Sequence, residues 1–237
     1  HYLIDAKDEF FDRVIKYLIA GNIRKGHLYP ICVGAERGLQ AEKLATFAKH
    51  NNSDTVAHGC TAAGNDQVRF DVALRTIDPQ LTILAPIRDN NWSREEQLLF
   101  LNNYSDVLAS KNSDYSYNRG LWGITIGGNE TLTSLSSIPE EVWPLSAHAY
   151  KTNLPPTNYL IRFKNGIPTS LNDTHYNPVK LIEKLEEISS SYAIGRGIHL
   201  GDTIIGTKGR VAFEAPAATI LILSLIHISE PTRQFRI

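Results

Sequence analysis

The sequence has little cysteine, almost no net charge and no long apolar run. Its 237 residues include two cysteines, Cys32 and Cys60, without metal-type spacing, so we expect free thiols in a reducing cytosol. The formal net charge of −1 gives no electrostatic argument for binding nucleic acid or an anionic membrane. No apolar run is long enough to span a bilayer, and no secretory signal pattern opens the chain. We therefore expect a cytoplasmic protein without a nucleic-acid or membrane partner.

What the chain does contain is the composition of an ordinary globular protein. Hydrophobic residues make up 42% of it and charged residues 21%, and the length suffices for one large domain or two small ones. Two consecutive parts of the sequence show different patterns.

The first part alternates segments typical of helices with short segments typical of buried strands. Asp5 can cap a first helix, and a second helix is predicted over residues 37–49. The stretches "DTVAHG" and "QLTILAP" indicate compact strands. A further helix is predicted where Ser93 and Glu96 have the spacing of a capping box. This alternation with short links predicts an α/β domain with a largely parallel sheet over residues 1–108.

The pattern changes in the second part. The stretch "SDYSYNRGLWGITIGGNETL" is rich in glycine, serine and aromatic residues, which is typical of loops lining a site. Alternating residues around Asn165-Gly166 predict a hairpin, and Asn177-Pro178 predicts the start of a helix. We therefore expect a second domain of α+β type over residues 109–222. Residues 223–237 continue no periodic pattern and look non-native, so they are excluded from the predicted fold.

The stretch "HGCTAAGNDQVRFD" combines a small-residue turn with polar side chains. Ligands of open α/β sheets bind at the carboxyl ends of strands, and His58-Gly59 follows a predicted strand. Asp66 could hold an ammonium group and Arg69 a carboxylate, which together suit a zwitterionic amino acid. The alternative is a capped helix whose charged side chains are solvated. The residues alone leave both interpretations open.

Four separated stretches resemble one family. "AHGCTAAGNDQVRFD", "YSYNRGLWG", "GRGIHLGDTIIGTKGRVAFEAP" and the pair Tyr29-Pro30 are similar to argininosuccinate synthase. The resemblance implies an α/β fold, a parallel-sheet ATP-pyrophosphatase domain (adenine nucleotide hydrolase-like) followed by an α+β synthetase domain. It also implies a carbon–nitrogen ligase that joins citrulline and aspartate through a citrullyl-adenylate, at the expense of ATP, in arginine biosynthesis. Mg²⁺ would neutralise the triphosphate, and no metal-ligating side chain is predicted.

The same resemblance assigns ligands to residues of this chain. Gly59 would lie against the nucleotide. Aspartate would contact Thr61, Asn65 and Asp66, of which Asn65 and Asp66 are the expected catalytic residues. Citrulline would contact Tyr29, Asn65, Arg69, Ser116 and Thr125. Taken singly, Tyr29 and Ser116 have alternative interpretations, as a packed turn aromatic and as a solvated loop hydroxyl.

The sequence also departs from the family pattern. It contains neither the Ser-Gly-Gly-x-Asp-Thr-Ser loop that would cradle pyrophosphate nor the carboxyl-terminal helices of a homotetramer, so we expect an internal fragment with little activity alone. Gly34, Gly201 and Phe213 stand where the family carries Ser, Glu and Tyr. Because a carboxylate partner for the α-ammonium of citrulline is then missing, we expect an α-N-acylated citrulline as substrate, unless the neighbouring Asp202 substitutes.

Two other functions remain open. A related adenylating enzyme of the tRNA-thiolation type would need catalytic cysteines in a thiolation motif and a basic face, and the sequence shows neither. A non-catalytic amino-acid-binding module would keep the pocket for sensing or for assembly. In every case His58 is expected to be tied into local hydrogen bonds at a strand end rather than to act as a base.

Overall fold

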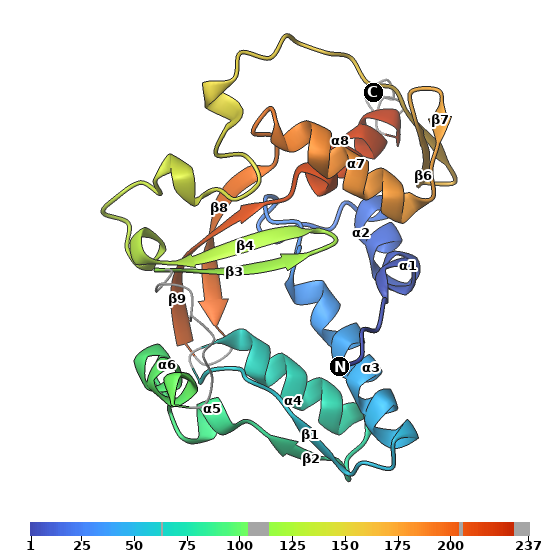
Figure 1. Cartoon of the computed structure of the whole chain (residues 1–237). Helices are drawn as coiled ribbons and strands as arrows, with labels where there is room; N and C mark the ends of the chain where they lie inside the picture. Colours follow the sequence, from blue (N-terminus) through green and yellow to red (C-terminus); the bar gives the residue numbers. More distant parts are fainter. Residues whose placement is uncertain (63, 104–113, 204–205, 230–237) are drawn as a thin grey trace, which may run out of the picture. The chain divides into compact units, whose positions relative to one another are not determined.

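The computed structural model describes residues 1–62, 64–103, 114–203 and 206–229. Contacts divide the described residues into two compact units, each with its own hydrophobic core. The first unit draws on His1–Glu36, Tyr115–Gly201 and Lys208–Ile237, and the second on Arg37–Asp114 and Asp202–Thr207. Figure 1 labels helices and strands of both units.

The second unit is a parallel strand pair with helices. Its elements in chain order are α3 (Arg37–His50), β1 (Thr55–Ala57), α4 (Asn65–Ile77), β2 (Thr82–Leu84), α5 (Pro86–Asp89) and α6 (Arg94–Asn102). β1 and β2 pair in parallel, with Val56 opposite Ile83. The core that α3, α4 and β1 share includes Ala45 and Leu74. The predicted alternation of helices with parallel strands is confirmed.

Local signals explain where these helices begin. At the start of α6, Ser93 Oγ accepts a hydrogen bond from the Glu96 N–H (3.2 Å), and the Glu96 carboxylate accepts one from the Ser93 N–H (2.6 Å). The predicted capping box is therefore present. Gly64 caps α4 with extended backbone, so this helix begins at Asn65 directly after the small-residue turn. Pro86 occupies the first turn of α5, where its missing N–H costs nothing.

The first unit opens with a continuous helical segment. α1 (Lys7–Phe10), the π-helical turn η1 (Phe11–Ile15) and α2 (Lys16–Ala20) follow one another without a break. The N-cap position of α1 is Ala6 rather than the predicted Asp5, although the Asp5 carboxylate does accept a hydrogen bond from the Lys7 N–H (3.0 Å) at the start of the helix. The π-helical turn buries Phe11 and Ile15, so it belongs to the core of the unit. A short 3₁₀ turn, η2 (Gly34–Glu36), follows further along the chain.

The largest sheet of the first unit has four strands. Its order is β3 (Tyr115–Gly120), β4 (Gly123–Gly128), β9 (Gly206–Glu214) and β8 (Arg196–Thr203). β3 and β4 form an antiparallel hairpin, so the prediction of loops for this stretch is wrong. Glycines and serines dominate its composition, but Ile124 and Ile126 alternate with half-buried residues along β4 and are themselves buried. That short alternation was the signal for a strand.

A three-stranded antiparallel sheet follows in the first unit, made of β5 (Ile161–Lys164), β6 (Ile167–Leu171) and β7 (Thr174–His175). The turn between β5 and β6 has φ of 53° at Asn165 and 78° at Gly166, and the predicted hairpin is confirmed. The 3₁₀ turns η3 (Asn129–Leu132), η4 (Glu140–Val142) and η5 (Ala149–Lys151) lie between β4 and β5 in the sequence.

Two long helices complete the unit. In α7 (Pro178–Ser190), the Asn177 side chain accepts a hydrogen bond from the Lys180 N–H (2.8 Å), so the predicted helix start is confirmed. α8 (Pro216–Ser229) packs against α2 and α7 and runs into the stretch excluded from the predicted fold. That exclusion was wrong for residues 223–229, whereas the non-native origin of residues 223–237 stays a prediction. No helix in the described parts of the chain is both long and apolar enough to cross a membrane.

Candidate functional site at the carboxyl end of β1

The small-residue turn lies directly after β1, at the carboxyl edge of the parallel strand pair. The His58 N–H still bonds to the Leu84 carbonyl (2.9 Å), which extends the ladder by one residue. A Cβ added at Gly59 would meet no atom within 4 Å, and Gly59 is not among the residues with positive φ. The fold therefore does not itself require glycine there, and the backbone is open to a ligand.

Helix α4 carries three of the predicted site residues in its first turns: Asn65, Asp66 and Arg69. Asp66 Oδ1 lies 2.9 Å from Arg69 Nη1, and Asp66 Oδ2 lies 3.0 Å from Arg37 Nη2. Burial alone would raise the pKa of Asp66, but the two guanidinium groups outweigh it and lower that pKa. Asp66 and Arg69, which the sequence assigned to opposite ends of amino-acid ligands, are thus paired with each other.

Arg37 is a site residue that the sequence reasoning missed. It opens α3, its side chain is 12% exposed, and its guanidinium lies 5.9 Å from the centroid of the Phe70 ring. Its Nη1 donates to Gln40 Oε1 (2.8 Å). No local spacing connects it to Asp66, because the contact spans two helices. With two guanidinium groups and one carboxylate, the cluster carries excess positive charge and favours an anion.

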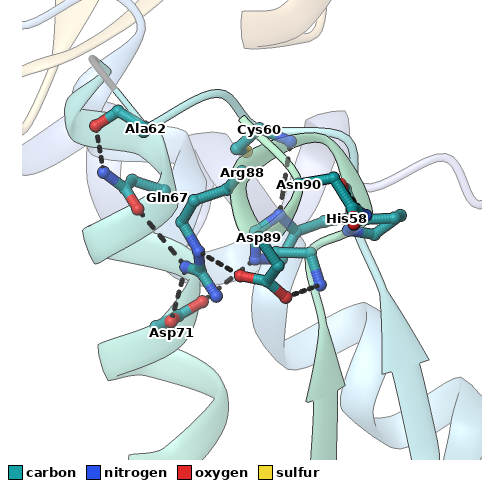
Figure 2. A network of polar contacts seen from close by, with 10 residues as sticks. His58, Cys60, Ala62, Gln67, Asp71, Arg88, Asp89 and Asn90 are labelled. Carbon is teal, nitrogen blue, oxygen red and sulfur yellow. Dashed lines mark hydrogen bonds and ion pairs between the residues drawn. The ribbon is translucent and has the colours of Figure 1, made fainter. Parts of the chain in front are cut away.

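A second polar network surrounds the turn (Figure 2). His58 Nε2 lies 3.0 Å from Asp71 Oδ1, and Arg88 Nη1 lies 2.8 Å from Asp71 Oδ2. Burial would raise the pKa of Asp71, but the contacts to His58 and Arg88 outweigh it and lower that pKa. His58 Nδ1 accepts from the Cys60 N–H (3.3 Å), so the expectation that local hydrogen bonds hold His58 is confirmed.

Thr61 is exposed in the turn between β1 and α4 of the second unit. Tyr29, Ser116 and Thr125 belong to the first unit, and the last two lie on one face of its four-stranded sheet. Thr125 pairs with Asn118 on one side and with Phe213 on the other, and Ser116 pairs with Gly127. Because paired residues of antiparallel strands point to the same face, Ser116 and Thr125 share the face of Phe213. Ser116 is exposed and lies on a strand, so its interpretation as a loop hydroxyl is wrong.

Tyr29 packs over the same face. Its ring stacks on His199 with centroids 4.3 Å apart, and it is tilted against Phe213 at 5.1 Å. The Trp122 indole N–H donates to the Pro30 carbonyl (3.1 Å), which ties this segment to the β3–β4 turn. With 8% exposure, Tyr29 has the packing role of the alternative interpretation, and its contact with citrulline stays a prediction.

A carboxylate that the sequence did not single out lies on this face as well. Glu36 is 8% exposed, and a Cβ added at Gly120 of β3 would lie 2.8 Å from its Cδ. Gly201, where the family carries Glu, lies in β8 and is buried. The side chain of Asp202 lies outside the described residues.

Two consecutive parts of the chain resemble known proteins. Residues 1–105 match the family model described as the arginosuccinate synthase N-terminal HUP domain, and residues 115–232 match the arginosuccinate synthase C-terminal domain. A protein of Sulfurisphaera tokodaii named argininosuccinate synthase is 37% identical over 224 residues, 94% of this chain and 57% of the relative. Proteins of the same name from Dictyoglomus thermophilum and Staphylococcus haemolyticus are 37% and 35% identical to this chain over 222 residues each. These residues make up 93% of this chain and 55% and 56% of the two relatives.

A parallel strand pair with polar residues after β1, followed along the chain by a separate mixed domain, defines a two-domain α/β protein of the HUP class. The chain belongs to the argininosuccinate synthase family, and the predicted family and fold class are confirmed. The chain spans a little over half the length of these relatives.

Proposed function

We propose that the chain carries the amino-acid side of an argininosuccinate synthase reaction. In this reaction the ureido oxygen of citrulline attacks the α-phosphorus of ATP, and the bond to pyrophosphate breaks. The aspartate nitrogen then bonds to the ureido carbon, loses a proton, and AMP leaves with the oxygen. The overall chemistry is an ATP-dependent carbon–nitrogen ligation that belongs to arginine biosynthesis in the cytoplasm.

The observation that carries the proposal is the crowding of polar residues after β1. Gly59 offers open backbone to the nucleotide, and the first turns of α4 bring Asn65, Asp66 and Arg69 next to it. The Asn65 amide can donate to one amino acid and accept from the other. Arg69 can fork onto the carboxylate of citrulline, while Asp66 and Thr61 contact aspartate. Both charged groups must then give up part of their mutual pairing when ligands bind.

In the first unit, we assign Tyr29, Ser116 and Thr125 to citrulline. The described residues contain no group of three carboxylate, imidazole or thiol side chains that could hold a metal ion. We propose that Mg²⁺ is bound mainly by the phosphates of ATP, the usual arrangement for this ion. We also propose that residues 1–108 form the nucleotide-binding domain and 109–222 the synthetase domain, and that the whole protein is a homotetramer.

The function is tested by following pyrophosphate release from ATP with citrulline and aspartate. We expect citrulline alone to give at most one equivalent of pyrophosphate, and continued release to require aspartate as well. The release is expected to be slow, because the sequence lacks the Ser-Gly-Gly-x-Asp-Thr-Ser loop. The Gly59→Val variant is expected to lower the affinity for ATP about ten-fold, because its side chain would occupy space that the nucleotide needs. Equilibrium binding of ATP measures this effect.

The matched control is Gly38→Ala. Gly38 also has no atom within 4 Å of an added Cβ, but it lies in α3 rather than in the turn. Its replacement is expected to leave ATP binding unchanged. Equal ATP affinity of wild type and Gly59→Val, with the fold intact, would contradict the assignment of the nucleotide to this turn.

The second amino-acid substrate is proposed to be citrulline with an acylated α-nitrogen. Gly201 supplies no carboxylate for an α-ammonium group, and an amide nitrogen needs none. We expect calorimetry to show tighter binding of α-N-acetylcitrulline than of citrulline. The Gly201→Glu variant is expected to reverse this preference by restoring a negative charge.

Tighter binding of plain citrulline to the wild type would contradict the proposal that the substrate is α-N-acylated. It would instead point to Glu36, which lies against Gly120 on the same face as Thr125, as the partner of the ammonium group. The Glu36→Gln variant separates these outcomes, because it weakens citrulline binding only in the second case.

A further inference from the structure

We infer that the Asp71–Arg88 ion pair is the positioning element that sets the conformation of the turn at residues 58–62. The pair itself does not reach the turn backbone. It acts through two intermediate side chains, His58 and Gln67, each of which binds one backbone group of the turn. That this turn then binds ATP and aspartate rests on the proposed function. The positioning of the turn by the ion pair does not.

The first anchor holds the amino end of the turn. His58 Nε2 faces a carboxylate oxygen of Asp71 at 3.0 Å, so this nitrogen must carry the proton. Nδ1 is then an acceptor, and it receives the Cys60 N–H at 3.3 Å. The His58 side chain is only 7% exposed, so water does not compete strongly for either contact. Asp71 thereby selects the tautomer that can bind the turn.

The second anchor holds the far end of the turn. The Gln67 side chain donates through Nε2 to the Ala62 carbonyl and accepts through Oε1 from Arg88 Nη1 at 3.3 Å. Because Arg88 occupies the amide oxygen, the amide nitrogen must face the turn. Arg88 therefore orients Gln67 as Asp71 orients His58.

The two anchors converge because Arg88 Nη1 also binds Asp71 Oδ2 at 2.8 Å (Figure 2). Arg88 is itself held by Asp89, whose Oδ1 lies 3.0 Å from Nε and whose Oδ2 accepts from the Ala85 N–H at 3.2 Å. Ala85 directly follows β2, so the network ties the turn after β1 to the end of the neighbouring strand. The backbone from Cys60 to Ala62, which directly follows the open backbone of Gly59, is thus held at both ends.

The thiol of Cys60 reports on this turn. Cys60 is half-buried, so opening of the turn exposes its thiol further and raises the rate at which the thiolate is alkylated. The other thiol, Cys32, is fully buried with its pKa raised to about 12, so it does not compete. In Asp71→Asn, iodoacetamide is expected to alkylate the Cys60 thiolate about ten-fold faster than it alkylates the Cys60 thiolate of the wild type.

A comparison between thiolates is needed because charge alone also changes the reactivity. The Asp71 charge raises the pKa of Cys60 and the Arg88 charge lowers it, so removing them shifts the thiolate fraction in opposite directions. Measurement over a range of pH gives the thiol pKa and the limiting rate of the thiolate separately. Positioning by the pair requires the limiting rate to rise in both Asp71→Asn and Arg88→Gln.

Conservative and distant variants complete the experiment. Asp71→Glu retains the carboxylate and is expected to recover most of the wild-type rate, and Glu95→Gln, an exposed residue in the first turn of α6, is expected to change nothing. Limiting rates that match wild type in both Asp71→Asn and Arg88→Gln would overturn the inference, as would changes of opposite sign. Whether ATP protects Cys60 of the wild type from alkylation tests the proposed function separately. If ATP gives no protection, the proposed function is contradicted, while the rates of the variants measured without ATP still test the positioning.

Discussion

Replacing Gly195 with alanine is expected to lower the free energy of unfolding of the first unit by about 3 kcal/mol. Gly195 has φ of 85°, and an added Cβ would lie 2.6 Å from the carbonyl carbon of Ala215 and 2.6 Å from the nitrogen of Pro216. These are backbone atoms at the start of α8, and the Ala215 N–H donates to the Gly195 carbonyl (2.9 Å). Neither strand nor helix can move without breaking that bond, so the strain is not relieved.

Urea denaturation followed by circular dichroism measures this loss, and Gly127→Ala is the matched control. Gly127 lies within β4, has no positive φ, and would place its Cβ in open space. Its replacement is expected to change the free energy of unfolding by less than about 0.5 kcal/mol. Similar losses in the two variants would show that the close approach of Gly195 to the start of α8 does not constrain the fold.

The Arg196→Met variant is expected to lose about 3 to 5 kcal/mol of the free energy of unfolding. The Arg196 guanidinium donates two hydrogen bonds to the Glu140 carboxylate, at 2.9 and 2.5 Å. Its carbon lies over the rings of Trp143 and Tyr150, 4.9 and 5.2 Å from their centroids. Its Nε also lies 3.9 Å from Glu214, which is 1% exposed. Methionine fills much of the volume but leaves the Glu214 carboxylate buried without a cation.

The pH dependence of that loss identifies its cause. Burial raises the pKa of Glu214 although hydrogen bonds from Ser146 and Leu145 and the charge of Arg196 oppose it. A carboxyl with a raised folded-state pKa contributes stability below its unfolded pKa of about 4.3 and loses it as pH rises. Thermal unfolding should therefore show a smaller loss for Arg196→Met near pH 4 than near neutrality, and Glu214→Gln in the same background should recover stability at neutral pH. A loss independent of pH would mean that packing, not charge, dominates.

The second unit was largely predictable because its signals are local. The Ser93 capping box marks the start of α6, and "DTVAHG" and "QLTILAP" contain the two parallel strands with little ambiguity. The position of the small-residue turn followed from the same strands, since the carboxyl end of β1 is where such a turn must lie. The residues of the candidate site could therefore be named from sequence and family resemblance together.

Long-range pairing could not be predicted in the same way. The contact between Arg37 and Asp66 joins two helices whose relative placement no spacing rule supplies, and it changes the charge that a ligand meets. The β3–β4 hairpin was missed because a segment rich in glycine and serine is typical of loops. The hairpin forms because Ile124 and Ile126 are buried by packing across the strands. In both cases the determining interaction lies far away in sequence.

The β3–β4 hairpin also limits how this part of the gene can change over evolution. The turn at Leu121 and Trp122 sets the register in which Ser116 and Thr125 share one face. Since side chains alternate with a period of two, inserting or deleting one residue within a strand would turn part of this face over. Point substitutions can therefore accumulate along the hairpin, while changes in length are restricted to the segments beyond its ends.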